Sequence, residues 1–494
     1  MKELVERALD LATQKGAAYA DVRVQRQESQ SVLVKNGTVE QVALGEDGGF
    51  GVRVLVDGAW GFASSYRLTA QEVDEVTDQA IRIAKASARV HQRAVVLGEP
   101  VRSRGSYKTP MEIDPFTVPL EEKIALLLRA DEEMRRVKQV TVATGQLINT
   151  RDIKTFANTE GAYTEQEIVQ TGSGISATAR GEGEVQRRSW PSGGGRNQSC
   201  AGWETVLHWD FPGNAYRIAD EAAQLLAAKQ CPPGVKTVII EGSQLALQVH
   251  ESCGHPIELD RVFGTEAAFA GTSFLTPDKL NEFQYGSDVV NITADATMAT
   301  GLGSFGWDDE GVPAQNVDII KNGRFVGYLT DRESAAKLGS LRTSKRPTAQ
   351  RHPTRSMGAA RASGWNRIPL VRMTNVSLLP GTWKVDDLIA DTDDGIYLST
   401  NRSWSIDDRR LNFQFGTELA YEIKNGKMGA LLKNATYTGI TPEFWRSCDA
   451  VCGEADWYPW GTPNCGKGQP SQTMHTGHGA APARFRNVRV GVAK

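Results

Sequence analysis

The segment 250–255 carries the residue types most suited to chemistry in this chain. It reads His-Glu-Ser-Cys-Gly-His, so two imidazoles flank a carboxylate. Neutral imidazoles bind Zn²⁺ well, and a catalytic zinc site uses three protein ligands while leaving one position for water. The carboxylate beside the first histidine, Glu251, can take a proton from that water. The segment therefore predicts metal-assisted hydrolysis of an amide.

The spacing of the two histidines constrains the backbone between them. The usual zinc-peptidase motif is H-E-x-x-H, whereas His250 and His255 lie five residues apart. Five residues correspond to about 140° around a regular α-helix, compared with about 40° for the usual spacing. We therefore predict that the motif helix ends, or widens into a π-type turn, at Gly254, whose missing Cβ makes either distortion inexpensive. Ser243 is the predicted N-cap of this helix.

A third ligand must come from another His, Cys, Asp or Glu. Glu258 follows the second motif histidine by three residues and is one candidate. Cys465 is another, because a thiolate stabilised by zinc suits its setting among small residues beside a lysine. His475 and His478 follow closely, and each is either a ligand or a loop histidine. The residues alone leave Glu258 and Cys465 as nearly equal candidates.

Length and composition are those of a soluble enzyme. The 494 residues predict two or three domains, and no apolar run approaches the roughly 20 residues that span a bilayer. The N-terminus lacks the apolar stretch of a signal peptide, so we expect a cytoplasmic protein. A net charge of −3 favours neither nucleic acid nor membrane as a partner. The six cysteines do not resemble a disulfide framework, and Cys253 is expected to be a buried, inert thiol.

Residues 1–230 are predicted to form an α+β domain with an antiparallel sheet and long helices. Apolar periodicity predicts helices at 4–15, 69–88, 119–138 and 218–229, and strands at 19–27, at 31–34 and through much of 139–188. The pairs Asn36-Gly37 and Asp57-Gly58 suit the positive φ angles of tight hairpin turns. The run Cys231-Pro232-Pro233-Gly234 breaks both helix and strand, so the domain boundary is placed there.

Residues 231–494 are predicted to form a β-rich, barrel-like domain that carries the motif helix. The hairpin signal recurs at Asn322-Gly323 and Asn425-Gly426, which favours antiparallel pairing. The three acidic residues 308–310 form either a turn or a group that orients a histidine. The stretch 445–460, rich in Trp and containing Cys448 and Cys452, is interpreted as a structural excursion.

A basic stretch at 342–367 contains seven Lys and Arg residues and no acidic residue. Three interpretations compete for it. It is a solvated loop, a lid that holds a peptide carboxylate or the tetrahedral oxyanion, or a nucleic-acid site. The last is the weakest, because the stretch lacks interleaved aromatic residues.

The chain resembles the TldD/PmbA family of metalloproteases, and specifically its catalytic TldD-type subunit. The resemblance covers nearly the whole chain and is specific after Val235. It rests on separate stretches: H-E-S-C-G-H-P-I-E-L-D at 250–260, F-A-G at 269–271, D-D-E-G-V-P at 308–313, P-L-V-R-M-T-N at 369–375, D-G-I-Y-L at 394–398 and C-G-K-G-Q at 465–469.

The resemblance implies a ligand set, a substrate class and a partner. It implies that zinc is held by His250, His255 and Cys465, with Glu251 as the catalytic acid/base. Unfolded or modified peptide would be hydrolysed in an enclosed cleft that binds its backbone by strand addition. The family forms dimers, either homodimers or heterodimers with a PmbA/TldE-type subunit. Two alternatives remain: a metal hydrolase acting on a non-peptide amide, and a non-catalytic peptide-binding subunit, although such subunits lack the motif ligands.

Overall fold

The N-terminal part of the protein is built on one large, mainly antiparallel sheet, in which, of the described pairings, only that of β4 with β6 is parallel. The computed structural model describes residues 1–90, 93–181, 183–341, 355–468 and 471–491. The sheet order is β3-β2-β1-β5-β6-β4, and β7 and β8 also pair with β6. Its strands are β1 (Tyr19–Lys35), β2 (Thr38–Val56), β3 (Ala59–Ser65), β4 (Arg104–Lys108), β5 (Val140–Asn158), β6 (Tyr163–Gly181), β7 (Glu184–Trp190) and β8 (Asn197–Ser199).

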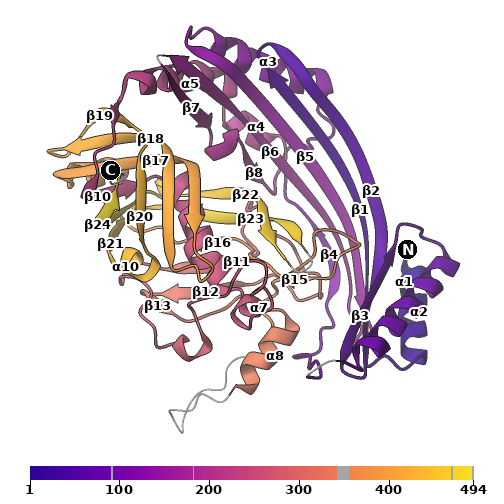
Figure 1. Ribbon diagram of the computed structural model, residues 1–494. Coiled ribbons are helices and arrows are strands. Elements are labelled where there is room, and N and C mark those ends of the chain that lie inside the picture. Colours follow the sequence, from indigo (N-terminus) through magenta and orange to yellow (C-terminus); the bar gives the residue numbers. More distant parts are fainter. Residues whose placement is uncertain (91–92, 182, 342–354, 469–470, 492–494) are drawn as a thin grey trace.

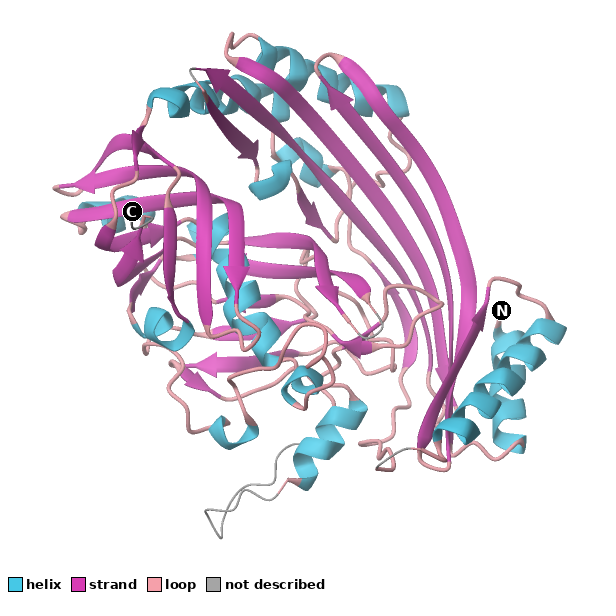
Figure 2. Ribbon diagram, in the orientation of Figure 1, coloured by secondary structure: helices cyan, strands magenta, loops and turns pink. Residues whose placement is uncertain are grey.

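Helices cover the two ends of this sheet (Figure 2). At one end α1 and α2 bury small and β-branched side chains against β1 and β2. At the other end α3 and α5 pack against each other and against β5 and β6. The helices are α1 (Lys2–Gln14), α2 (Ala70–Ser87), α3 (Leu120–Arg135), α4 (Glu204–His208) and α5 (Phe211–Ala227).

The predicted hairpins of this part are confirmed, and two predicted boundaries are wrong. Asn36 and Asp57 have φ angles of 48° and 50°, as tight two-residue turns require. The predicted strands 19–27 and 31–34 form the single strand β1. Helix α5 begins earlier than predicted, because the Asp210 side chain accepts a hydrogen bond from the Gly213 N–H and caps it.

The C-terminal part contains a closed five-stranded barrel. In the order β17-β10-β24-β20-β18 each strand pairs with the next, and β18 pairs with β17 to close the ring. Strands β19, β9 and β21 extend this sheet. The barrel strands and their extensions are β9 (Lys229–Gln230), β10 (Gly234–Ile240), β17 (Asp394–Ile406), β18 (Asn412–Lys424), β19 (Lys427–Lys433), β20 (Thr436–Ile440), β21 (Cys448–Val451) and β24 (Ala483–Val490).

Smaller sheets and short helices pack around the barrel. Asn322 and Asn425 have the positive φ angles expected of their hairpin turns. The remaining strands are β11 (Ile292–Asp295), β12 (Asn316–Lys321), β13 (Arg324–Phe325), β14 (Ala360–Arg361), β15 (Leu370–Val371), β16 (Val376–Leu378), β22 (Tyr458–Lys467) and β23 (Gln472–Ala480). The helices are α6 (Gly242–Val249), α7 (Leu259–Val262), α8 (Arg332–Ser340), α9 (Val385–Ala390) and α10 (Thr441–Arg446). The fold is α+β with a barrel in its C-terminal part, as predicted.

The two parts face each other across the molecule. The long strands β1, β2, β5 and β6 arch past the C-terminal part (Figure 1). Buried ion pairs join the parts: Arg188 of β7 lies 3.2 Å from Glu418 of β18, and Arg53 of β2 lies 3.0 Å from Glu310. Within the described ranges, no helix is long and apolar enough to cross a membrane.

Candidate metal centre

Helix α6 positions the first motif histidine at its C-terminal end. The helix begins after Glu241, whose carboxylate accepts hydrogen bonds from the Ser243 N–H at 2.9 Å and from the Ser243 hydroxyl at 2.6 Å. The prediction that Ser243 is the N-cap is therefore wrong. The residue before the helix does the capping, because a longer carboxylate side chain can also reach the free amide groups of the first turn.

The predicted π-type turn is confirmed between the two motif histidines. Residues His250–Gly254 form a single π turn, and a 3₁₀ turn, His255–Ile257, follows. The His255 N–H donates to the His250 carbonyl, a bond that spans five residues. This wider turn brings the two imidazole rings onto the same side of the helical segment, with ring centroids 4.8 Å apart and ring planes at 84°.

Gly254 serves this turn for a steric reason. Its φ and ψ are −56° and −57°, which any residue adopts in a helix. A Cβ at this position would lie 2.1 Å from the Met373 Sδ atom. The glycine is therefore needed to let the turn approach the buried Met373.

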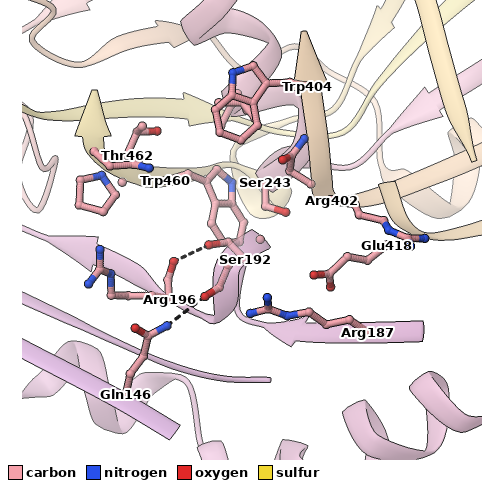
Figure 3. A pocket seen from close by; sticks show the side chains of 18 of the residues that line it. Gln146, Arg187, Ser192, Arg196, Ser243, Arg402, Trp404, Glu418, Trp460 and Thr462 are labelled. Atoms are coloured by element: carbon pink, nitrogen blue, oxygen red, sulfur yellow. Dashed lines mark hydrogen bonds between the residues drawn. The ribbon is translucent and has the colours of Figure 1, made fainter. Parts of the chain in front are cut away.

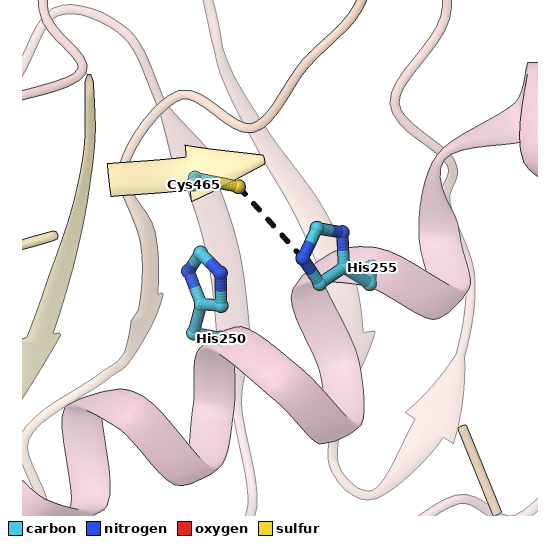
Figure 4. A group of neighbouring side chains, drawn as sticks. All are labelled: His250, His255 and Cys465. Atoms are coloured by element: carbon cyan, nitrogen blue, oxygen red, sulfur yellow. Dashed lines mark hydrogen bonds between the residues drawn. The ribbon is translucent and has the colours of Figure 1, made fainter. Parts of the chain in front are cut away.

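Cys465 of strand β22 completes a cluster with the two histidines. Its Sγ atom lies 3.7 Å from the His255 Nε2 atom, and one donor atom from each of the three residues lies within 4.8 Å of the others. All three side chains are buried and converge on one point (Figure 4). The structure brings Cys465, and not Glu258, together with the motif histidines.

Glu258 contacts the cluster from behind. Its Oε2 atom lies 2.9 Å from the His255 Nδ1 atom, so Nδ1 donates to the carboxylate and Nε2 is left facing Cys465. Burial by itself would raise the pKa of Glu258, but the charge of Lys467 and the interaction with His255 hold that pKa well below its usual range. The carboxylate therefore stays ionised and fixes the tautomer of His255.

His478 of strand β23 fixes the tautomer of His250, as Glu258 does for His255. The His250 Nδ1 atom lies 2.7 Å from the His478 Nε2 atom, and the His478 Nδ1 atom lies 2.9 Å from the Val376 carbonyl oxygen. Because a carbonyl only accepts, His478 Nδ1 carries the proton and His478 Nε2 accepts from His250. The His250 Nε2 atom is thereby left with a free lone pair.

The environment of Cys465 favours its thiolate. Burial would raise the pKa of this thiol, but interactions with His255 and with the cationic Arg372 bring it below its ordinary value. Arg372 is fully buried and donates to the backbone carbonyl of Cys465. A thiolate is the form in which cysteine binds a metal.

The donor set fits a zinc ion. Two imidazole nitrogens and one thiolate are zinc-preferring ligands, and tetrahedral bonds of ordinary length would separate their atoms by about 3.3–3.6 Å. The observed limit of 4.8 Å requires only small inward shifts. Burial lowers the pKa of both His250 and His255, which favours the neutral, metal-binding form.

Three family models match this chain. Three segments match the three domains described as PmbA/TldA metallopeptidase: domain 1 over residues 20–84, the central domain over 113–230 and the C-terminal domain over 233–491. The last match alone covers more than half of the chain. The chain belongs to the PmbA/TldD metalloprotease family.

Relatives of this PmbA/TldD protein align over nearly its full length. A metalloprotease of Methanocaldococcus jannaschii is 29% identical over 97% of both chains. A metalloprotease TldD homolog of Buchnera aphidicola is 27% identical over 99% of this chain and 94% of its own. A zinc metalloprotease TldD homolog of Saccharolobus solfataricus is 22% identical over 97% of this chain and 98% of its own.

Solved structures share the fold of this PmbA/TldD protein. A putative modulator of a DNA gyrase from Thermotoga maritima has a TM-score of 0.77 at 18% identity, covering 99% of this chain and all of that one. TldE from Thermococcus kodakarensis has a TM-score of 0.74 at 16% identity with the same coverage. At these identities the likeness concerns the fold alone.

Glu251 is paired with an arginine that the sequence did not single out. Arg410 donates from Nη1 to the Glu251 Oε2 atom at 2.7 Å. Among the described residues, no hydrogen bond is formed to the other carboxylate oxygen, Oε1. Arg410 lies in the charged turn 407–410 after β17, where a sequence pattern suggests only a solvated loop. Nothing local in the sequence marks it as a partner of Glu251.

The other predicted functional residues have structural roles. Cys253 is fully buried, and burial raises its pKa to about 12, as expected of an inert thiol. Asp308 accepts from the backbone N–H groups of Glu310, Val312 and Ala360 and so forms the predicted turn. His475 lies outside the cluster and bonds to Gln170 at 2.5 Å.

The basic stretch 342–367 is described only from residue 355 onward, and its residues 342–354 lie outside the described ranges. Arg361 is buried and donates to the carbonyl groups of Met373 and His475 at 2.7 and 2.8 Å. This arginine is neither solvated nor part of a lid.

The stretch 445–460 contacts the motif turn. Its Trp445 is buried and donates to the hydroxyl of Ser252, a residue of the π turn, at 2.9 Å.

Proposed function

We propose that this PmbA/TldD metalloprotease is a zinc-dependent peptidase that hydrolyses unfolded or modified peptides in an enclosed cleft. In this proposal His250, His255 and Cys465 hold the zinc ion. The observation that carries it is the arrangement of the three buried donors, with the Nδ1 atom of each histidine already engaged by Glu258 or His478. In metal sites, residues around the ligands hydrogen-bond to them and so fix the tautomer and orientation of each ligating histidine.

Glu251 is proposed as the general acid/base. A bound zinc ion supplies Lewis-acid polarisation of the scissile carbonyl and lowers the pKa of water at its open position. Arg410 holds the Oε2 atom of Glu251 at 2.7 Å, and Oε1, which no described residue hydrogen-bonds, would be free to accept a proton from that water. Glu251 then accepts the proton of this water and delivers it to the leaving amine. Arg410 keeps the carboxylate in one orientation through both transfers.

We infer that peptide approaches this site through a cavity of about 590 Å³, some of whose lining residues neighbour the site in sequence. It lies between the N-terminal sheet and the barrel, and its lining includes Leu247, one helical turn before His250, and Asn464, the neighbour of Cys465. Strand β22 belongs to a sheet of only two strands. We infer that peptide adds along such an edge, which recognises backbone and gives weak sequence preference.

We further infer that the chain functions as a dimer, as a homodimer or with a PmbA/TldE-type subunit. This inference is supported by the solved TldE of Thermococcus kodakarensis, which shares the fold over 99% of this chain and so offers a partner of the same architecture. Two other functions are distinguished by experiment: hydrolysis of a non-peptide amide, and peptide binding without catalysis.

The test is hydrolysis of a fluorogenic, unstructured peptide by the full chain. We expect cleavage that stops with a zinc chelator and returns when zinc is restored. Cleavage that is indifferent to the chelator would contradict the proposal. A zinc-loaded chain that hydrolyses small amides but no peptide supports the first alternative, and one that binds peptide without cleaving it, with and without a PmbA/TldE-type partner, supports the second.

A further inference from the structure

The cavity between the sheet and the barrel has an unusual charge. Three arginines line it, contributed by three different segments: Arg187 of β7, Arg196 after the glycine turn 193–195, and Arg402 of β17. Figure 3 shows these side chains around the hollow. The whole chain has a net charge of −3, so a concentration of positive charge here is a local feature of the cavity.

The single carboxylate in the cavity lining, that of Glu418, already has hydrogen-bond and ion-pair partners in the protein. Glu418 of β18 accepts hydrogen bonds from the Ser189 N–H at 2.7 Å and the Ser189 hydroxyl at 2.8 Å. The guanidinium of Arg188 lies 3.2 Å from the same carboxylate. The charge of Arg187 also acts on Glu418, so this carboxylate is engaged by Arg188 and Arg187. Within the described residues no ion pair joins it to Arg196 or Arg402.

Arg196 is the arginine with no partner. Arg187 donates to the Ser176 hydroxyl at 3.3 Å, and Arg402 donates to the Asn434 side chain at 2.6 Å. Across the described ranges, no carboxylate or hydrogen-bond acceptor engages the Arg196 guanidinium. Burial lowers the pKa of this group. A partly buried cation without a counter-charge is costly unless a ligand supplies the charge.

The place of Arg196 links it to the metal centre. It lines the cavity together with the β22 residues Thr462 and Asn464, which lie three residues and one residue before Cys465. Its charge also acts on His475 of β23, the partner strand of β22. A ligand held at Arg196 would therefore lie beside the strand that leads to the metal site.

The rest of the wall suits a short peptide. Trp404 is 50% exposed and lines the cavity with Trp460 and Leu247. A volume of about 590 Å³ lies in the usual range for small-ligand sites, about 300–1,000 Å³. Aromatic side chains offer a large apolar contact area, and an unpaired guanidinium can hold a carboxylate through two parallel hydrogen bonds.

We propose that Arg196 binds a carboxylate of the peptide substrate, so that the enzyme prefers peptides carrying a carboxylate at a short distance from the scissile bond. The proposal rests on the peptidase function proposed above and adds a substrate class to it. Two sources supply this chemistry: the C-terminal carboxylate of a short peptide, and an Asp or Glu side chain. Arg187 and Arg402 add long-range attraction for the same charge.

Equilibrium binding tests this proposal without requiring catalysis. Fluorescence anisotropy would measure the Kd of the full-length Glu251→Ala chain for matched fluorescent peptides. One pair differs only in a free or an amidated C-terminus, and a second, amidated pair differs only in Glu or Gln at successive positions. We expect about 10- to 100-fold tighter binding of the carboxylate member in at least one pair, as for hydrogen bonds to charged groups, and the pair that responds identifies the source.

Arg196→Gln in the same background should remove the preference. Its Kd for the carboxylate peptide should rise to that of the amide, with the amide's own Kd and the zinc content unchanged. Arg82→Gln, an exposed position on α2, removes the same charge far from the cavity and should keep the preference. Equal binding of both members in every pair, or a preference that survives Arg196→Gln, would overturn the proposal. If the binding preference is found but the zinc-loaded wild-type chain never cleaves peptide, only the peptidase function would be contradicted.

Discussion

Each of the two motif histidines has its Nδ1 atom engaged by a buried partner, which would prepare its Nε2 atom for the proposed metal. His255 donates to Glu258 and His250 donates to His478, so each presents Nε2 to the cluster. The sequence alone offered Glu258, Cys465, His475 and His478 as further ligands, and the resemblance selected Cys465. Sequence order could not distinguish a proposed ligand such as Cys465 from hydrogen-bond partners such as Glu258 and His478. A carboxylate or imidazole that holds a ligand has the same chemistry as one that binds the metal itself.

His478 should act as a positioning residue for His250. In His478→Ala the His250 ring loses its acceptor and its fixed tautomer, so we expect zinc affinity to fall by about 10- to 100-fold. Competition with a fluorescent chelator would measure this. His478→Gln, whose side-chain oxygen can still accept from Nδ1, should recover much of the affinity. His208→Ala, at an exposed position on α4, is the control, and unchanged affinity in His478→Ala would argue against the positioning role.

Glu251 should be dispensable for zinc and essential for turnover. Glu251→Ala removes the proposed base but none of the three donors, so we expect full zinc content and a loss of kcat of at least about 10²-fold. Peptide hydrolysis and metal analysis on the same preparation would check both parts. A variant that still cleaves peptide at the wild-type rate would remove Glu251 from the mechanism.

At the scale of elements, the motif turn was predictable because a five-residue spacing cannot work on a regular helix. The reason for Gly254 was not predictable, since it depends on Met373, which is distant in sequence. The hairpins at Asn36 and Asn425 were also predictable, because their turn chemistry is local. The prediction of Ser243 as the N-cap was wrong because the Glu241 side chain accepts the hydrogen bond from the first turn of the helix.

Gly254→Ala tests the steric account of the turn. The added methyl group would meet the Met373 Sδ atom at 2.1 Å, and such overpacking costs about 1–3 kcal/mol. We expect a lower free energy of unfolding, measured with urea, together with weaker zinc binding because the two histidines are displaced. Gly466→Ala lies beside Cys465 with open space around its Cβ and should change little. Equal effects of the two substitutions would refute the account.

At the scale of the whole molecule, the α+β class and the barrel-like C-terminal part follow from hairpin chemistry and periodicity. The closure of the barrel and the cavity beside it do not, because they depend on pairings between strands far apart in sequence, such as β10 with β17. The domain boundary at residues 230 and 231 stays a prediction. Strand β9, Lys229–Gln230, pairs with β19 of the C-terminal sheet, so the chain joins that sheet before the breaking sequence.

Buried histidine should make the fold sensitive to acid. Burial lowers the pKa of His475 to about 4, from an ordinary value of 6.5. Between these values the unfolded chain binds more protons, so stability is complete above about pH 6.5 and is lost as pH falls towards 4. From pH 7.5 to 5 this residue should cost about 2 kcal/mol. Urea unfolding at both pH values should show a smaller loss for His475→Gln than for wild type, and equal losses would contradict the assignment.

Whether His250, His255 and Cys465 hold zinc is best tested by the zinc content of the purified chain, measured by elemental mass spectrometry on wild type beside Cys465→Ala. We expect about one zinc ion per wild-type chain, since the cluster offers the three protein ligands of a catalytic site, and a sharp fall in the variant. A matched Cys253→Ala variant, which removes a buried thiol outside the cluster, should keep its zinc. Full zinc in Cys465→Ala, or no zinc in a folded wild-type chain, would contradict the account.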